Sequence, residues 1–231
     1  MDILKLHNIT FSYNEDIIIE NINLNLKKDE RISIVGSSGC GKTTLLKIIA
    51  GIENNFLGTI SSSKIAYMPQ KDLLLPWRNI ISNILLPIEL NKGDLNKGKI
   101  KALNFLDKLN LMNYAYKFPN ELSGGMKQRV SFLRTIITES DTLLLDEPFS
   151  ALDAITKEDL QHWLLDIIKD LKKSMVFITH DINEAIFLSN RILVCKNKPM
   201  NQLIEFKVKK NITSTELKEL KENILKIIRE G

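Results

Sequence analysis

Hydrophobic residues alternate with polar ones at the start of the chain, and this two-residue period predicts β-strands. The alternating residues are Leu4, Leu6 and Ile9 and, further on, Ile22, Leu24 and Leu26. A short apolar stretch at residues 31–35 predicts a third strand, which ends in a glycine-rich turn. Residues 43–50 follow as a helix, and Gly51 ends it. Residues 64–68 predict another short strand.

Between residues 79 and 137 the hydrophobic period becomes helical, with Ile100, Leu103, Leu106 and Leu109 at helical spacing. Pro119 and two adjacent glycines interrupt this stretch before a helix at residues 126–137. Strands then alternate with helices. We expect strands at residues 142–146, 175–179, 191–195 and 202–208, helices at 155–171 and 183–188, and an amphipathic helix at 215–229 with Leu217, Leu220, Ile224 and Ile227 on one face. The pattern predicts an α/β core with a helical insertion in its middle.

Composition narrows the class of protein. The chain has 231 residues, of which 44% are hydrophobic and 26% charged, which suits one large globular domain. The net charge is +4, and the basic residues are scattered, so we expect no nucleic-acid partner. No apolar run approaches the ~18–20 residues that span a bilayer, and the N-terminus has no signal-peptide pattern. We therefore expect a chain that is soluble by itself and reaches a membrane only through a partner.

The strongest chemical motif is the sequence GSSGCGKT, which follows a predicted strand and opens a predicted helix. Its glycines allow backbone angles that other residues avoid, and its amides and helix N-terminus attract phosphate. Lys42 adds a full positive charge for the β- and γ-phosphates of ATP, and Thr43 offers a hydroxyl to Mg²⁺. The loop consists of Gly36, Ser37, Ser38, Gly39, Cys40, Gly41, Lys42 and Thr43.

Cys40 lies inside this loop, and it and Cys195 are the two cysteines of the chain. A helix N-terminus and a neighbouring lysine should lower the pKa of the Cys40 thiol, as in a redox sensor. The alternative is a small residue that is tolerated at a variable position, and we favour this second interpretation.

A second site is predicted at residues 142–148, where the apolar strand TLLL ends in Asp146 and Glu147. Ligands bind at the carboxyl ends of strands in open α/β sheets. Asp146 is therefore a candidate for holding Mg²⁺, and Glu147 is a candidate general base for an attacking water.

A further glycine motif, LSGGMKQR at residues 122–129, also precedes a helix. With the phosphate loop and the acidic pair, it resembles the signature of the ATP-binding-cassette (ABC) ATPases. The resemblance implies that Ser123, Gly124 and Gly125 of one subunit close over ATP bound to another, so that two copies form a homodimer. It also implies that residues 150–153 are exchanged across the dimer.

The same resemblance covers nearly the whole chain and assigns further roles. Tyr13 resembles the aromatic residue that stacks on adenine, Gln70 the glutamine that contacts Mg²⁺, and His180 the switch histidine at the γ-phosphate. The implied catalytic residues are Glu147, His180 and Lys42. The implied ATP-binding set is the phosphate loop with Thr44, Tyr13, Gln70, Asp146, His180 and the three signature residues. The implied metal ligands are Thr43, Gln70 and Asp146.

The implied fold is a P-loop NTPase core, with a RecA-like mixed sheet and antiparallel N-terminal strands, into which an α-helical signature subdomain is inserted. Residues 1–231 then form one domain, with the core at 1–72 and 139–231 and the helical subdomain at 73–138.

The sequence LLPW at residues 74–77, soon after Gln70, resembles importers of nitrate, sulfonates, taurine and thiamine-precursor pyrimidines. It implies membrane permease partners, a separate substrate-binding protein and a place on the cytoplasmic face of the membrane. Trp77 would then lie beside the permease docking groove; the alternative is that Trp77 and Pro76 only cap a packed hydrophobic corner. The alternative function is a soluble ABC ATPase of DNA repair or translation, which would usually carry a coiled-coil insertion or two cassettes.

Overall fold

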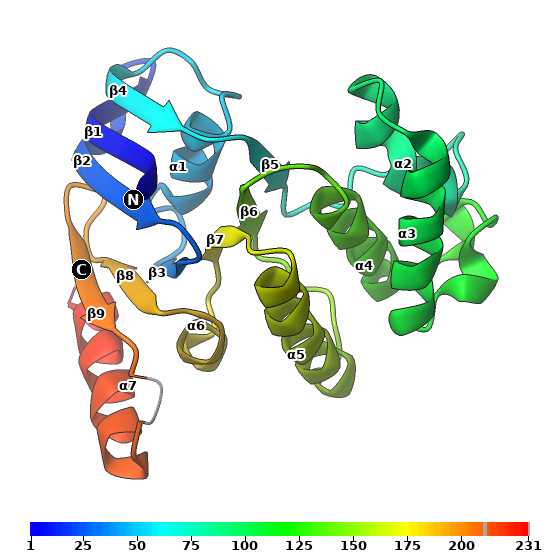
Figure 1. The fold of residues 1–231 in the computed structure, drawn as a ribbon. Coiled ribbons are helices and arrows are strands. Elements are labelled where there is room, and N and C mark those ends of the chain that lie inside the picture. Colours follow the sequence, from blue (N-terminus) through cyan, green and yellow to red (C-terminus); the bar gives the residue numbers. More distant parts are fainter. Residues whose placement is uncertain (210–211, 231) are drawn as a thin grey trace.

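A six-stranded sheet forms the centre of the computed structural model, which describes residues 1–209 and 212–230. Its strands lie in the order β5-β6-β7-β3-β8-β9 (Figure 1). Their bounds are β3 Arg31–Gly36, β5 Ile65–Met68, β6 Thr142–Asp146, β7 Ser174–Ile178, β8 Arg191–Cys195 and β9 Leu203–Lys207. The pairs are parallel except β8 with β9, so the sheet is mixed, as predicted.

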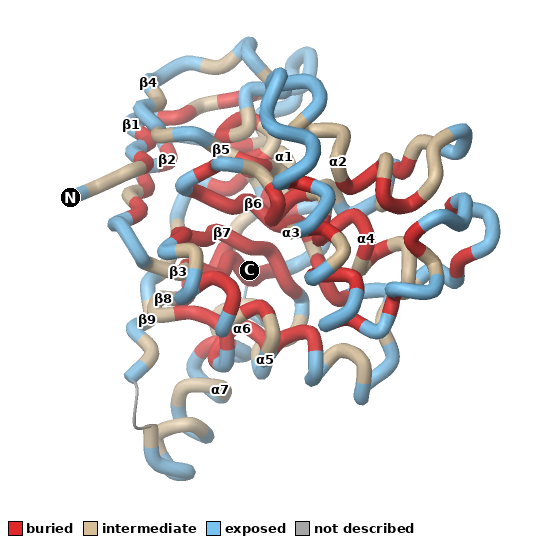
Figure 2. Tube along the Cα trace, turned by 45° about the vertical axis from the view of Figure 1, so that its right-hand side comes forward, coloured by how far each residue is buried: buried red, intermediate tan, exposed pale blue. Residues whose placement is uncertain are grey.

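Strands β6 and β7 are buried along their whole length because both faces of the sheet are covered. Successive side chains point to opposite faces. Leu143 and Leu145 pack with the helical insertion and with helix α5 (Ala154–Asp170), whereas Leu144 packs with the N-terminal strands and with helix α1 (Lys42–Ile49). Figure 2 shows the buried residues concentrated along these strands.

A separate antiparallel sheet in the order β2-β1-β4 covers one side of the core. Strands β1 (Asp2–Tyr13) and β2 (Asp16–Lys27) are the alternating segments that the sequence predicts. The sequence did not predict β4 (Leu57–Ser62), in which only Ile60 is even partly buried. Pairing of Leu6 with Ile60, 54 positions apart by residue number, makes this segment a strand.

Two further helices cover the other end of the central sheet. Helices α6 (Ile182–Leu188) and α7 (Ser214–Arg229) form a cluster with the hydrophobic side chains of β8. The predicted apolar face of the last helix is confirmed, because Leu217, Leu220, Ile224 and Ile227 all belong to this cluster.

Residues 73–138 contain the helical insertion, which Figure 1 shows as a group of helices to one side of the sheet. Its elements are α2 (Ile80–Leu90), α3 (Leu95–Lys108), the 3-10 turns Met112–Tyr114 and Pro119–Glu121, and α4 (Gly124–Ile136). Leu106 and Leu109 are buried, whereas Ile100 is 64% exposed, so the residues at helical spacing do not all lie on the buried face. The subdomain boundaries themselves stay a prediction.

Arg134 joins this helical part to the segment after Gln70. Its guanidinium donates to the carbonyl of Leu73 at 2.9 Å and to that of Asp72 at 2.6 Å. These two hydrogen bonds hold helix α4 against residues 72–73.

Within residues 1–209 and 212–230, no helix combines the length and apolarity needed to cross a membrane.

Candidate functional site

The loop between β3 and α1 is built around positive backbone angles and one buried lysine. Gly39 and Gly41 have φ values of 78° and 102°, which side chains rarely tolerate. Lys42 is 5% exposed, and its Nζ donates to the carbonyls of Gly36 at 3.0 Å and Ser37 at 2.7 Å. The amine is thus held inside its own loop at the N-terminus of α1, where backbone amides favour an anion.

Asp146 lies at the end of β6, beside the first turn of α1. The Thr43 hydroxyl donates to its Oδ1 at 3.2 Å. Burial, and secondarily the charge of Glu147, raise the pKa of this carboxyl. Its Oδ2 is buried and has no hydrogen-bond partner among the described residues. A buried carboxylate oxygen without a partner is costly, and a hard divalent cation relieves that cost, so the pair Thr43 and Asp146 fits Mg²⁺.

Glu147 brings together residues from three loops. Its backbone has a φ of 49°, and its amide donates to the carbonyl of Ile178 at 3.1 Å. Gln70 Nε2 donates to Oε2 of Glu147 at 2.9 Å, and His180 Nε2 lies 2.7 Å from Oε1. These three side chains follow β5, β6 and β7, which are neighbours in the sheet. The strand order therefore places them together.

A cavity of about 480 Å³ connects these groups. Most of the predicted ATP-binding residues line it: Tyr13, Ser38, Gly39, Gly41, Lys42, Thr43, Thr44, Gln70 and His180. The predicted base, Glu147, lines it as well. Ile18 also lines it and was missed, since an isoleucine in a strand carries no ligand-binding signal in the sequence. The volume and the cationic loop suit a nucleotide with several phosphates.

Tyr13 stands at the open edge of this cavity. The ring is 42% exposed, packs edge-on against Phe11 with centroids 4.8 Å apart, and its hydroxyl donates to Glu53 at 2.9 Å. The ring is thus held in place while much of its surface stays free.

Gly36, Ser37, Cys40 and Asp146 are not among the residues that line the cavity. The Cys40 side chain is 1% exposed and lies beside Cys195, which is also buried. A hydrogen bond from Cys195, aided by the charge of Lys42, lowers the pKa of the Cys40 thiol below its ordinary value. The predicted direction of this shift is therefore confirmed, and Cys195 is a cause that the sequence did not reveal.

The signature residues lie away from the cavity of their own chain. Ser123 caps α4 by accepting from the amide of Met126 at 3.3 Å, and both Ser123 and Gly124 are exposed. A Cβ on Gly124 would meet nothing within 4 Å, whereas on Gly125 it would come within 3.1 Å of Leu152. The structure leaves the start of α4 open and brings its second glycine against residues 151–152.

Gln128 links helix α4 to the loop after β6, a role that we did not predict from its position in the sequence. It is 4% exposed; its side-chain amide donates to the carbonyl of Glu147 at 3.0 Å and accepts from the amide of Ala151 at 2.9 Å. Its position within the motif LSGGMKQR was the one feature of the sequence that could have indicated this role. The helix that starts with the signature is thus tied to the loop that starts with Glu147.

Comparison with known proteins identifies the family. The model of the ABC transporter family matches residues 19–150, which is more than half of the chain. The chain belongs to the ABC transporter family. Since the ATP-binding proteins of this family hydrolyse ATP, this cassette is an ATP-binding ATPase.

Curated relatives of the cassette match it over most of their length. It is 37% identical to the formylaminopyrimidine import ATP-binding protein ThiZ of Halalkalibacterium halodurans, over 97% of this chain and 94% of that protein. It is 39% identical to the aliphatic sulfonates import ATP-binding protein SsuB of Bacillus thuringiensis subsp. konkukian, over 93% of this chain and 89% of that protein.

Solved structures agree on the fold. The dimeric bacterial ABC transporter cassette MJ0796 is 31% identical and superposes with a TM-score of 0.80, covering 90% of this chain and all of that one. A post-hydrolysis dimer of MJ0796 with ADP and Pi has a TM-score of 0.79 at 30% identity, with 90% of this chain covered. This likeness confirms the predicted P-loop NTPase fold of the ABC cassette.

Proposed function

We propose that this ATPase energises a bacterial importer as a homodimer bound to membrane permease subunits on the cytoplasmic face of the membrane. The observation that carries the proposal is an exposed apolar segment directly after Gln70, in a chain closely related to import ATP-binding proteins. Leu73 is 60% and Trp77 72% exposed, while Leu74 between them is 8% exposed and anchors the segment. The alternative, in which Trp77 caps a packed corner, is wrong because its ring faces solvent.

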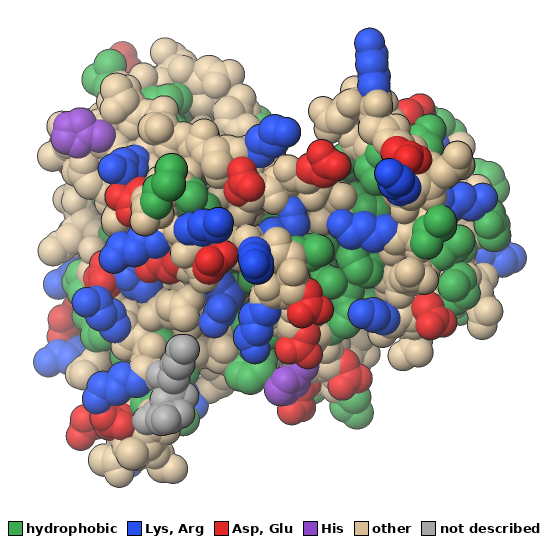
Figure 3. Space-filling model, in the orientation of Figure 1, with side chains coloured by type: hydrophobic (Ala, Val, Ile, Leu, Met, Phe, Trp, Pro, Cys, Tyr) green, Lys and Arg blue, Asp and Glu red, His purple; other side chains and the backbone are tan. Residues whose placement is uncertain are grey.

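The exposed segment supports a docking role for a physical reason. Contiguous apolar surface beside a polar site usually marks an interaction site, and tryptophan is enriched among residues that dominate interface energies. Asn83 holds the segment in shape, accepting from the amide of Leu75 at 2.7 Å and donating to the carbonyl of Arg78 at 2.9 Å. Figure 3 shows hydrophobic side chains gathered on the helical part of the face drawn, whereas acidic and basic ones are interspersed over the core.

In the proposed ATP site, the loop amides and Lys42 bind the phosphates and Tyr13 stacks on the adenine. Thr43, Gln70 and Asp146 would hold Mg²⁺, which when bound neutralises charge on the phosphates. Glu147 accepts a proton from the attacking water, and His180, 2.7 Å from Glu147, contacts the γ-phosphate. Removal of that proton makes the water a stronger nucleophile. Its oxygen bonds to the γ-phosphorus while the bond from that phosphorus to the β–γ bridging oxygen breaks, which releases phosphate and ADP.

The second half of each ATP site is proposed to come from the second copy. Ser123, Gly124 and Gly125 are outside the cavity of their own chain, although Ser123 and Gly124 expose free backbone at a helix N-terminus. The phosphates of an ATP molecule bound to the second copy would be suitable ligands for these amides. The homodimer thus accounts for a second glycine motif in a chain that has one phosphate loop.

The proposed cargo is a small compound of the sulfonate, taurine, nitrate or pyrimidine type, delivered by a separate binding protein. It rests on the similarity to import ATP-binding proteins for formylaminopyrimidine and for aliphatic sulfonates. The test is uptake of labelled taurine, an alkyl sulfonate and a formylaminopyrimidine in cells that lack the gene, complemented with the natural chain or with Glu147→Gln. We expect the natural chain to restore uptake and Glu147→Gln not to restore it. Unchanged uptake of all three compounds after deletion of the gene would refute the proposed cargo class. The importer role itself is tested by purifying an affinity-tagged copy of the chain from membranes. If no membrane subunit is recovered with it, the importer proposal is refuted.

A further inference from the structure

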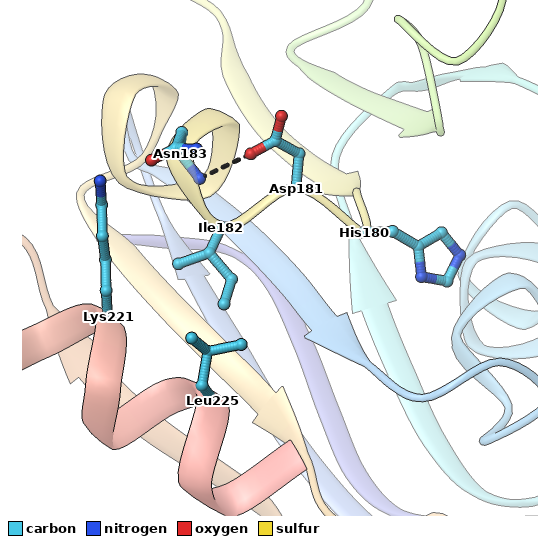
Figure 4. A pocket seen from close by; sticks show the side chains of 6 residues that line it. All are labelled: His180, Asp181, Ile182, Asn183, Lys221 and Leu225. Atoms are coloured by element: carbon cyan, nitrogen blue, oxygen red, sulfur yellow. Dashed lines mark hydrogen bonds between the residues drawn. The ribbon is translucent and has the colours of Figure 1, made fainter. Parts of the chain in front are cut away.

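The residues on both sides of His180, Thr179 and Asp181, are held by hydrogen bonds to helix α6 and to each other. Thr179 is 3% exposed, and its hydroxyl donates to the carboxylate of Glu184, which is 5% exposed in helix α6. The same hydroxyl accepts from the amide of Asp181 at 3.0 Å, and Asp181 Oδ1 accepts from the amide of Asn183 at 2.8 Å. Figure 4 shows this last bond, with the Asp181 carboxylate beside α6 and the His180 ring directed the other way.

One cation, Lys157, joins these two carboxylates. Its Nζ lies 2.9 Å from Asp181 Oδ2 and also contacts Glu184. Burial alone would lower the pKa of Lys157, but its hydrogen bonds to Glu184 and Asp181 outweigh burial and raise it. Burial would raise the pKa of Asp181, yet its bond to Lys157 leaves that pKa lowered. Lys157 and Asp181 therefore form a charged pair at neutral pH, and the carboxylates of Asp181 and Glu184 share the same lysine.

Lys157 belongs to a different part of the fold, the first turn of α5. Asp153 caps this helix, its side chain accepting from the amide of Thr156 at 3.0 Å, and its carbonyl accepts from the amide of Lys157 at 2.9 Å. Residues 150–153, which the family resemblance places at the dimer interface, lie directly before it. The other end of this loop is Glu147, 2.7 Å from His180. The contacts thus form a closed circuit from Glu147 through residues 150–153, Lys157 and Asp181 back to His180.

We propose that Lys157 is a positioning residue for His180, which couples the loop at residues 150–153 to the placement of the imidazole against Glu147. This rests on the proposed role of His180 in hydrolysis. Lys157 is not among the residues that line the cavity. A neutral side chain at position 157 leaves Asp181 and Glu184 without their shared cation, so the turn that carries His180 relaxes.

The test uses the purified full chain and its Lys157→Met, Lys157→Arg and Lys169→Met variants. Lys169 is a matched control, since it lies on the same helix and its ion pair, 4.0 Å from Asp166, is exposed. We expect Lys157→Met to lower kcat for ATP about tenfold, in the range of coupling through a contact network, with KM unchanged. Arginine should restore most of the rate because it can pair with both carboxylates, and Lys169→Met should leave the rate unchanged.

A second measurement does not depend on activity. The chain has three histidines, so the imidazole NMR signals of His7, His162 and His180 can each be assigned. In Lys157→Met the His180 signal should shift while that of His7 stays in place. An unchanged His180 signal, or an equal fall in kcat for Lys169→Met, would overturn the proposal. If Lys157→Met does not fold, Lys157→Gln is judged by the same criteria. A different result would refute the proposed function of His180 itself: a His180→Ala variant that hydrolyses ATP at the same rate as the natural chain.

Discussion

The two tryptophans of the chain offer a sharp test of the docking surface, because Trp77 is largely exposed whereas Trp163 is mostly covered by the core of the helical part. Trp77 is 72% exposed. Trp163 packs edge-on against Phe105 and Phe132, with ring centroids 5.7 and 5.8 Å away. Truncation of a buried tryptophan costs about 3–5 kcal/mol. Scaled by the buried quarter of Trp77, Trp77→Ala should cost about 1 kcal/mol of unfolding free energy.

For a chain of this size, 1 kcal/mol shifts the melting temperature by about 2–4 °C. We therefore expect purified Trp77→Ala to melt within about 4 °C of the natural chain and to keep its ATPase rate, whereas Trp163→Ala should lose roughly 10 °C. Calorimetry and a phosphate-release assay measure both. With tagged permease, Trp77→Ala should be recovered in much smaller amounts than the natural chain.

Fluorescence gives the same prediction a direct readout. In a Trp163→Phe background, Trp77 is the remaining indole, and its emission should be quenched readily by acrylamide. Addition of detergent-solubilised permease should protect it. A large fall in both melting temperature and ATPase rate of Trp77→Ala, or quenching that the permease does not alter, would contradict the docking surface.

Three further predictions concern the ATP site and the core. Glu147→Gln should retain ATP binding but lose about 10²–10⁴ in hydrolysis rate, because only the proton acceptor is removed; near-normal turnover would show that another group is the base. A mixture of Ser123→Arg and Lys42→Ala chains should exceed the activity of either alone, because one composite site stays intact; a rate per chain independent of concentration would argue against sharing. Burial lowers the pKa of Lys173 to about 8 from an unfolded value of 10.5. Between pH 8 and pH 10.5 the lysine therefore carries a proton in the unfolded chain but not in the folded one, so a rise in pH favours the folded chain. The unfolding free energy, measured relative to Lys173→Met, should rise by up to about 3 kcal/mol from pH 7 to 10.5.

The sequence was sufficient for the elements whose signal is local. Strands β6 and β7 are continuous apolar runs, and the phosphate loop is a contiguous motif with a fixed mechanism. Strand β4 has no such signal, since only its distant pairing with β1 defines it. The exposure of Ile100 depends on which side of α3 the neighbouring helices occupy, which spacing alone does not give.

For the site, the sequence identified the residue types but not their convergence. Gln70, Glu147 and His180 meet because β5, β6 and β7 are adjacent, and strand order is set by the whole fold. The links made by Gln128 and Lys157 were not foreseen for a related reason. A polar residue in a helix has many exposed positions available to it, and only packing decides that these two reach another loop.

The clasp that Arg134 forms with residues 72–73 has a consequence for idle ATP consumption. One carboxylate oxygen of Glu147 accepts from Gln70 and the other lies against His180, so the position of Gln70 helps to set the orientation of the proposed base. Helix α4 cannot swing without pulling on the chain two residues beyond Gln70. In the proposed importer, a membrane subunit that moved the helical part would therefore also move the segment that holds Gln70 against Glu147, and ATP hydrolysis in the absence of cargo would be reduced.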